Sequence, residues 1–173
     1  MPIVRSCKLP ANALLHRYCG SGAYADCYVA EVAGCVSQAE FVEAFYTTCV
    51  FKLERLILRL IVSRPSTDME AKQLANGTTD SFAAWRVESR TPDQLLMSEF
   101  TGRTRSWFMA VGSASAHPLK TSLFFGSAVV PTRSAKTGRT SLGPVFRALL
   151  GFHKLYSWIL LRAAAARLSR QAG

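Results

Sequence analysis

The sequence contains no long apolar run and no segment typical of membrane insertion or secretion. Its longest stretch without Asp, Glu, Lys or Arg covers only 14 residues, from Ser106 to Leu119, whereas a membrane-spanning helix needs roughly 20 apolar residues. At the N-terminus, Arg5, Lys8 and Pro10 interrupt the apolar core that a signal peptide would require. We therefore expect a protein that is not transmembrane and that is cytoplasmic.

The chain also lacks the residue patterns that hold metals and the common motifs of enzymes. Its five cysteines include no Cys-x-x-Cys pair, and no paired histidines accompany them, so we expect reduced, inert thiols and no zinc site. No GxxxxGK[ST], HExxH or GxSxG motif occurs, which argues against nucleotide binding, zinc hydrolysis and serine-nucleophile hydrolysis. We expect neither a metal nor a cofactor.

Acidic residues are absent from the last 42 residues, which carry eight Lys and Arg side chains out of a net charge of +10. Arg147, Lys154 and Arg162 fall on one face of the helix predicted there, with Trp158 between them. A basic face with an interleaved aromatic residue is typical of surfaces that bind anionic lipid, nucleic acid or an acidic protein. A solvated helix face followed by a frayed tail is the alternative.

What the chain does contain is enough apolar material for a core. Of its 173 residues, 49% are hydrophobic and 18% are charged, which predicts one globular domain over residues 1–173. Residues 1–23 look irregular because of their Pro and Gly residues. Residues 24–168 form the predicted core, and residues 169–173 form a basic tail.

Two capping boxes, Ser37-Gln38-Ala39-Glu40 and Thr67-Asp68-Met69-Glu70, predict helix starts. The first helix should run without a break to Pro65 and the second should stop at Asn76-Gly77. A final helix is predicted from Pro144 to Leu168. The first helix carries an apolar stripe for the core, made of Val42, Tyr46, Cys49, Leu53, Leu56 and Leu60. Phe51, Leu58 and Val62 form a lesser strip on its far side, which suits a homodimer contact.

Alternation with a period of two predicts strands in between. The segments are 24–34, 82–90, 94–100, 103–111 and 121–132, and turn residues separate the last four. The predicted fold class is therefore α+β, with about five antiparallel strands wrapped around a long C-terminal helix, in the order β-α-α-β-β-β-β-α.

This order of elements resembles the helix-grip fold of the START-like (SRPBCC) superfamily over roughly residues 24–168. The strings FVEAFYTTCVFKLERLIL, RPSTDMEAKQLANG, GRTRSWFMAV, FFGSAVVP and LLGFHKLYSWILL also look similar to an uncharacterised bacterial family near that superfamily. The chain departs from the usual pattern in having about five strands where seven are typical. The resemblance implies a hydrophobic ligand cavity between sheet and terminal helix, and it implies no catalytic residues.

The candidate ligand-binding residues are polar or aromatic side chains expected on the inner faces. His153 and Tyr156 lie on the apolar side of the last helix, where each either contacts a ligand or bonds within the core. Strand alternation places Arg105 on the same face as Trp107. Arg105 then either faces a cavity mouth, with Glu54 as its ion-pair partner, or is an exposed arginine at the strand end. Trp85 is expected in the core, next to the same cavity.

Three functions remain open from these residues. The first is binding or carriage of an apolar small molecule in the cavity. The second is an enzyme of the cyclase or dehydratase sort that uses His153 as acid or base, although the sequence favours a protein that is not an enzyme. The third is an interaction protein that uses its basic C-terminal face.

Overall fold

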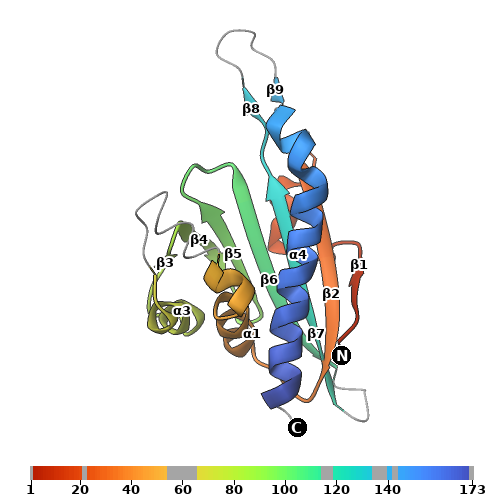
Figure 1. Cartoon of the computed structure of the whole chain (residues 1–173), viewed down its shortest axis with the longest axis vertical. Coiled ribbons are helices and arrows are strands. Elements are labelled where there is room, and N and C mark those ends of the chain that lie inside the picture. Colours follow the sequence, from red (N-terminus) through yellow and green to blue (C-terminus); the bar gives the residue numbers. More distant parts are fainter. Residues whose placement is uncertain are drawn as a thin grey trace.

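One large antiparallel sheet forms the centre of the molecule (Figure 1). The structure, a computed structural model, describes residues 2–20, 23–53, 66–113, 119–133, 140–141 and 144–171. The strands of the sheet are β1 (Val4–Ser6), β2 (Tyr24–Ala33), β3 (Ser81–Phe82), β4 (Trp85–Arg90), β5 (Gln94–Glu99), β6 (Thr104–Ser113) and β7 (Lys120–Val129). They pair in the order β1-β2-β7-β6-β5-β4-β3. The predicted α+β class is confirmed.

The expected count of about five strands is wrong, because the sheet has seven. The two additional strands lie at its edges, and β1 has 3 residues and β3 has 2. Strands this short contain no full period of alternation, so a periodicity argument does not detect them. A separate hairpin, β8 (Thr132–Arg133) with β9 (Thr140–Ser141), follows the large sheet.

The helices α1 (Gln38–Tyr46), α3 (Asp68–Ala75) and α4 (Pro144–Gln171) lie on one side of the sheet (Figure 1). Both predicted capping boxes are present at the starts of α1 and α3. Helix α4 continues to Gln171, so part of the predicted basic tail is helical. Among the described helices, none combines the length and the apolar character needed to span a bilayer.

The prediction of an unbroken helix from Ser37 to Pro65 is wrong, because α1 ends at Tyr46. Helix resumes at Cys49, and the Oγ1 atom of Thr48 accepts a hydrogen bond of 3.1 Å from the backbone N–H of Phe51. A threonine that caps a new helix in this way interrupts the old one.

The break rotates the two apolar strips predicted for this segment. Leu53, expected in the core, is 60% exposed, and Cys49 is also exposed. Phe51, expected on a dimer surface, is 2% exposed and packs in the core. Leu56, Leu58, Leu60 and Val62 lie outside the described residues, so the predicted homodimer surface has lost its one described member.

The main core lies between the sheet and the helices, and aromatic rings fill its centre. The ring centroid of Phe45 on α1 lies 4.8 Å from that of Phe108 on β6 and 4.7 Å from that of Phe125 on β7. Tyr46 packs against Phe51 at 4.7 Å in the same cluster. These contacts fix α1 over the middle of the sheet and leave one end of the interior for polar residues.

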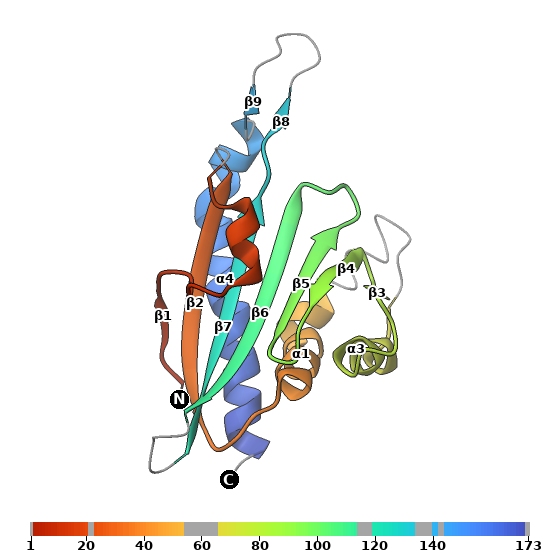
Figure 2. The same ribbon diagram turned by 180° about the vertical axis from the view of Figure 1, so that it is seen from behind.

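The opposite face of the sheet is covered by the N-terminal segment, as the view from behind shows (Figure 2). This segment is not wholly irregular, since it contains β1 and a 3-10 helix, η1 (Leu14–Tyr18). Leu15 of η1 is fully buried in a second core cluster together with Trp107 and Leu96. The sheet is therefore buried on both faces in this region.

Candidate functional site

A row of polar side chains crosses the inner face of the sheet below α4. Asp26 on β2 pairs with Ser127 on β7, and Ser127 pairs with Ser106 on β6. Residues that face one another in register on neighbouring antiparallel strands point to the same side of the sheet. Ser127 and Ser106 are both buried, so the row lies at the bottom of the helix-covered interior.

His153 on α4 completes a hydrogen-bonded cluster with this row. Its Nε2 atom lies 2.7 Å from Ser127 Oγ, and Ser127 Oγ donates to Asp26 Oδ1 at 2.6 Å. The backbone N–H of Ser127 and the hydroxyl of Tyr24 also donate to this carboxylate, at 3.1 Å and 2.9 Å. Since the single hydroxyl proton of Ser127 goes to Asp26, Ser127 Oγ accepts from an Nε2–H of His153.

The electrostatics of the cluster keep its histidine and its tyrosine uncharged near neutral pH. Burial lowers the pKa of His153 below its ordinary value, and the nearby charge of Asp26 opposes this shift without cancelling it. Burial together with the charge and hydrogen bonding of Asp26 raises the pKa of Tyr24. Asp26 accepts hydrogen bonds from three donors in the cluster.

A cavity of about 190 Å³ opens beside this cluster, between the sheet and α4. Its polar wall is made of Thr104, Ser106, Ser127, His153, Tyr156 and Ser157. Its apolar wall is made of Phe45, Tyr46, Phe51, Trp85, Phe125 and Leu160. Aromatic and apolar side chains and a set of hydroxyl groups thus line the cavity together.

Three of the predicted ligand-binding residues meet in this cavity: Trp85, His153 and Tyr156. The helical spacing places His153 and Tyr156 one turn apart on α4. Trp85, the first residue of β4, lines the same cavity. The ring of Tyr156 stacks on that of Phe152, with centroids 5.9 Å apart. Phe152 is 66% exposed, so this stack lies at the border between the cavity and the surface.

The expectation that Arg105 and Trp107 face the same cavity is wrong, because both lie on the other face of the sheet. Trp107 is fully buried, but in the cluster beneath the N-terminal segment. Its Nε1–H donates to Gln94 Oε1 at 2.8 Å, and the same oxygen accepts from the Leu14 N–H at 3.0 Å. Trp107 and Gln94 therefore hold η1 against the outer face of the sheet.

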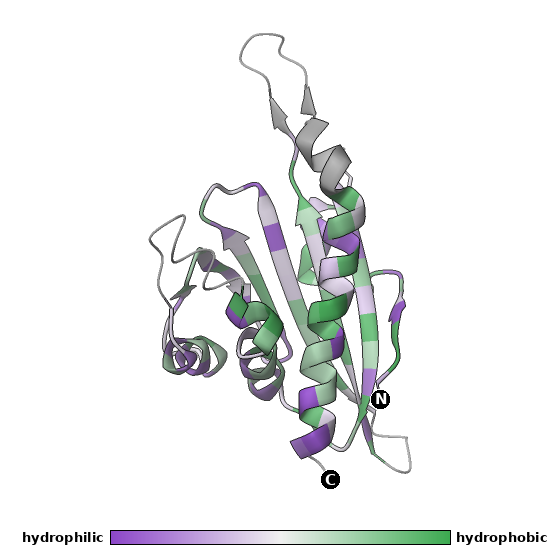
Figure 3. Cartoon of the chain, viewed as in Figure 1, coloured by the Kyte–Doolittle hydropathy of each residue, from purple (hydrophilic) through white to green (hydrophobic). Residues whose placement is uncertain are grey.

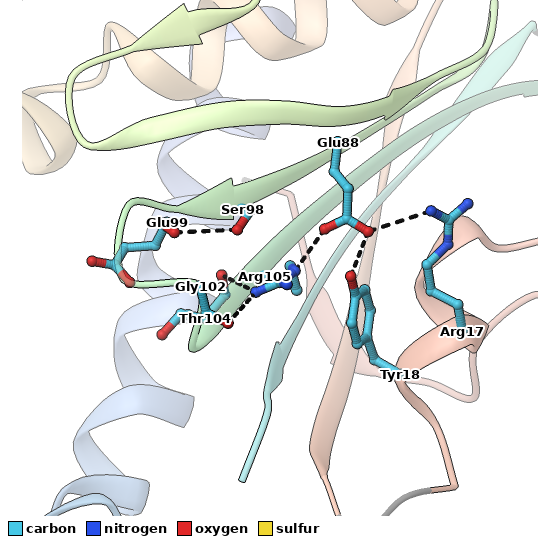
Figure 4. A network of polar contacts seen from close by, with 8 residues as sticks. All are labelled: Arg17, Tyr18, Glu88, Ser98, Glu99, Gly102, Thr104 and Arg105. Atoms are coloured by element: carbon cyan, nitrogen blue, oxygen red, sulfur yellow. Dashed lines mark hydrogen bonds and ion pairs between the residues drawn. The ribbon is translucent and has the colours of Figure 1, made fainter. Parts of the chain in front are cut away.

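Arg105 forms an ion pair with Glu88, not with Glu54, which lies outside the described residues (Figure 4). Arg105 Nε donates to Glu88 Oε2 at 2.7 Å. Tyr18 and Arg17 of η1 also donate to Glu88. The guanidinium of Arg105 lies 4.6 Å from the ring centroid of Tyr18. Burial acts to raise the pKa of Glu88, but these hydrogen bonds and the charge of Arg105 hold it below its ordinary value. The network attaches η1 to the sheet.

The predicted basic surface on α4 is partly used within the fold. The side chain of Arg162 lies 5.1 Å from the ring of Trp158, and Trp158 Nε1–H donates to the backbone O of Val4 at 3.2 Å. Lys154 lies 5.8 Å from the ring of Tyr24, and Arg147 lies outside the described side chains. Along α4, hydrophobic and hydrophilic segments alternate in the outward view (Figure 3). Trp158 is thus hydrogen-bonded to β1 and covered by Arg162, and does not form an exposed aromatic site between two cations.

Sequence reasoning missed Asp26, Ser127 and Ser106, although a signal for Asp26 was present. In the predicted strand from residue 24, alternation places Tyr24, Asp26 and Tyr28 on one side. A carboxylate between two tyrosines on the face that also carries Ala30 and Val32 is a buried polar group, and such a group requires partners. The serines carry no comparable signal, since serine is common on both faces of strands.

The arrangement differs from that of a serine nucleophile. In a serine hydrolase, the histidine accepts the hydroxyl proton and a carboxylate orients its other nitrogen. Here Ser127 stands between the carboxylate and the imidazole and donates its proton to Asp26. The cluster can hold an uncharged imidazole in a defined orientation at the cavity wall. Ser127 links Asp26 to His153 through two hydrogen bonds.

Throughout the described part of the chain, no group of three or more His, Cys, Asp or Glu side chains is placed to hold a metal ion. Comparisons of the chain with family models, curated proteins and solved structures found no match. The interpretation of the site therefore depends on its geometry.

Proposed function

We propose that the protein binds a small neutral molecule with a single ring in the cavity beneath α4, and that its fold is of the START-like, helix-grip type. The order of elements supports the second part: one long strand, then helices, then an antiparallel meander, then a long helix against the sheet. The observation that carries the first part is a cavity lined both by aromatic residues and by the hydroxyl groups and imidazole around His153.

The size of the cavity limits the ligand. An apolar protein cavity of about 150 Å³ holds benzene, so a cavity of about 190 Å³ suits one ring with a small substituent. The aromatic wall favours a flat apolar ring. The hydroxyl groups of Ser106, Ser157 and Thr104 both donate and accept hydrogen bonds, which matches a hydroxyl or carbonyl substituent.

The charges around the cavity also limit the ligand. Of the described residues, no Lys or Arg lines the cavity, and Arg105 is bound to Glu88 on the other face. An anionic ligand would meet the carboxylate of Asp26 behind Ser127 and would lose its hydration without gaining a cation. The site is therefore expected to select a phenol over a benzoate.

The test is a titration of the protein at pH 7.5 with phenol, benzoate and 2-naphthol, followed by calorimetry and by ligand-observed NMR. We expect saturable phenol binding with a Kd on the order of 1 mM, as befits seven heavy atoms. Benzoate should bind at least tenfold more weakly because of its charge, and 2-naphthol because of its size.

Two variants decide whether the binding occurs in the cavity. Ser157→Leu fills the cavity from α4 and should abolish phenol binding, because Ser157 is buried at its wall. Ser113→Leu, at an exposed position at the end of β6, is the matched control and should bind as the wild type does. Equal binding by both variants, or tighter binding of benzoate than of phenol, would refute the proposal.

A second candidate function is proton transfer by His153, which the uncharged imidazole beside the cavity favours. Acetophenone is a suitable probe, because it is a neutral single ring with acidic C–H bonds next to a carbonyl. In deuterium oxide, the wild type should accelerate α-deuteration of acetophenone about 100-fold over His153→Gln. Equal rates in the two proteins would exclude this function.

A further inference from the structure

Two cysteines from different segments meet at the end of the β1–β2 pairing. The register pairs Ser6 with Tyr28, so the next opposed pair is Cys7 and Cys27. The Cys7 N–H donates to the backbone O of Cys27 at 3.0 Å, and the two Sγ atoms are 3.3 Å apart. Both are present as free thiols.

We propose that Cys7 and Cys27 are a redox pair that closes to an intramolecular disulfide by exchange with a low-molecular-weight disulfide such as oxidised glutathione. The proposal is independent of the ligand cavity, which lies on the other face of the sheet. It assigns a role to two of the thiols that the sequence predicts to be inert.

The accessibility of the two thiols determines the order of steps. Cys7 is half-buried and lines an open hollow of about 600 Å³ that also contains Lys8, Cys19 and Lys154. Cys27 also lines it but is only 3% exposed. The lining carries two lysines against one carboxylate, that of Asp26, and this balance favours the approach of an anionic disulfide. The incoming disulfide reaches Cys7 first, because Cys27 is the more buried of the two thiols.

The exchange balances in two displacements. The Cys7 thiolate attacks one sulfur of oxidised glutathione, the glutathione S–S bond breaks, and one glutathione thiolate leaves. The Cys27 thiolate then attacks Cys7 Sγ, the mixed disulfide breaks, and the second glutathione leaves. Both cysteine protons go to solvent, the protein loses two electrons, and oxidised glutathione is reduced to two glutathione molecules.

The environment of the pair makes the reaction slow and dependent on pH. Burial raises the pKa of Cys7, while the hydrogen bond with Cys27 and the charge of Arg5 act to lower it. Burial also raises the pKa of Cys27, with contributions from Cys7 and Asp26. Since only thiolates attack disulfides, closure should accelerate as the pH rises from 7 to 9.

A closed pair would lock the N-terminal segment onto the sheet. The two cysteines are separated by 20 positions along the chain, and the loop between them contains η1, which covers the outer core cluster. Cross-linking a loop of this size reduces the conformational freedom of the unfolded chain. We expect the midpoint of thermal unfolding to rise by roughly 5–10 °C.

The experiment exposes the full-length protein to oxidised glutathione at pH 8.5, blocks remaining thiols and digests it with chymotrypsin without reduction. Cleavage after Tyr18, Tyr24 and Tyr28 separates Cys19 from Cys27, so mass spectrometry assigns the partner of Cys7 without ambiguity. We expect a linked Cys7–Cys27 peptide and a fall from five titratable thiols to three.

Single variants complete the test. Cys7→Ser should abolish the cross-link and the thermal shift, whereas Cys35→Ser, at an exposed thiol, should retain both. A glutathione adduct that persists on Cys7, a Cys7–Cys19 link, or no loss of thiols in the wild type would each overturn the proposal. The wild-type digest gives this answer even if Cys7→Ser fails to fold.

Discussion

His153 couples the stability of the protein to pH, because its imidazole is buried away from water, beside the carboxylate of Asp26. The folded chain holds its pKa below 6.5, whereas in the unfolded chain it returns to about 6.5. The unfolded state therefore binds a proton first as the pH falls, and stability is lost from about pH 6.5 downward to the folded pKa. Above pH 7.5 the imidazole is neutral in both the folded and the unfolded chain, so it has no effect on stability.

The measurement compares free energies of urea unfolding for the wild type and His153→Gln between pH 5 and pH 8. We expect the wild type to lose stability relative to the variant as the pH falls, by about 1.4 kcal/mol for each tenfold difference in proton affinity. His16→Gln, at an exposed ring, is the matched loss of a histidine. A wild type that gains stability relative to His153→Gln at low pH would contradict the assignment.

At the same scale, the sequence predicted some site residues and misplaced others for a physical reason. Helical spacing in an amphipathic segment defines the inward face, which brought His153 and Tyr156 to the cavity. Alternation along a strand defines two faces without saying which one is inner. In β6, Trp107 and Phe108 point in opposite directions and both are fully buried, so apolar character did not tell the cavity side from the outer side.

At the scale of elements, the close approach of β2, β7 and η1 depends on Gly126. A Cβ atom added there would lie 2.9 Å from the backbone O of Asp26, 3.0 Å from Leu15 and 3.1 Å from Trp107. The first contact is with backbone, which cannot rotate away. Because Asp26 and Ser127 belong to the strands that would separate, the same change would disturb the polar cluster on the other face.

We therefore expect Gly126→Ala to reduce the free energy of unfolding by about 1–3 kcal/mol, as overpacking does in well-packed cores. Gly151→Ala is the control, since its added Cβ meets nothing within 4 Å. In the helix α4 this second change should stabilise by about 0.5–1 kcal/mol. Urea unfolding of both variants measures the contrast, and an unchanged Gly126→Ala would show that the strands can separate at little cost.

The elements themselves were predicted with mixed success. Both capping boxes and all five longer strands are present near their expected positions, because these signals are local. The helix break at Thr47 and Thr48 was missed, since the apolar spacing continues across it. Tertiary contacts favour the break: Arg167 of α4 donates to the backbone O and Oγ1 of Thr47 at 3.0 Å and 2.7 Å, and Phe51 enters the core.

At the scale of the whole molecule, the sheet separates two cores of unequal size. The larger one joins the sheet to α1, α3 and α4. The smaller one depends on the N-terminal segment, which Gln94, Glu88 and Arg105 hold in place. Leu15 is its central contribution, with a fully buried side chain against Trp107 and Gly126.

This division predicts that weakening the smaller core exposes one face of the sheet while the larger core persists. Leu15→Ala should reduce the free energy of unfolding by about 2–5 kcal/mol and should shift the fluorescence of Trp107 toward that of a hydrated indole. Leu119→Ala, at a leucine that is 47% exposed, is the control. Hydrogen exchange should show faster exchange in η1 of Leu15→Ala, while amides of β1, whose Val4 packs in the larger core, and amides between β6 and β7 stay protected. Uniform acceleration across both faces would instead mean that the two cores unfold as one unit.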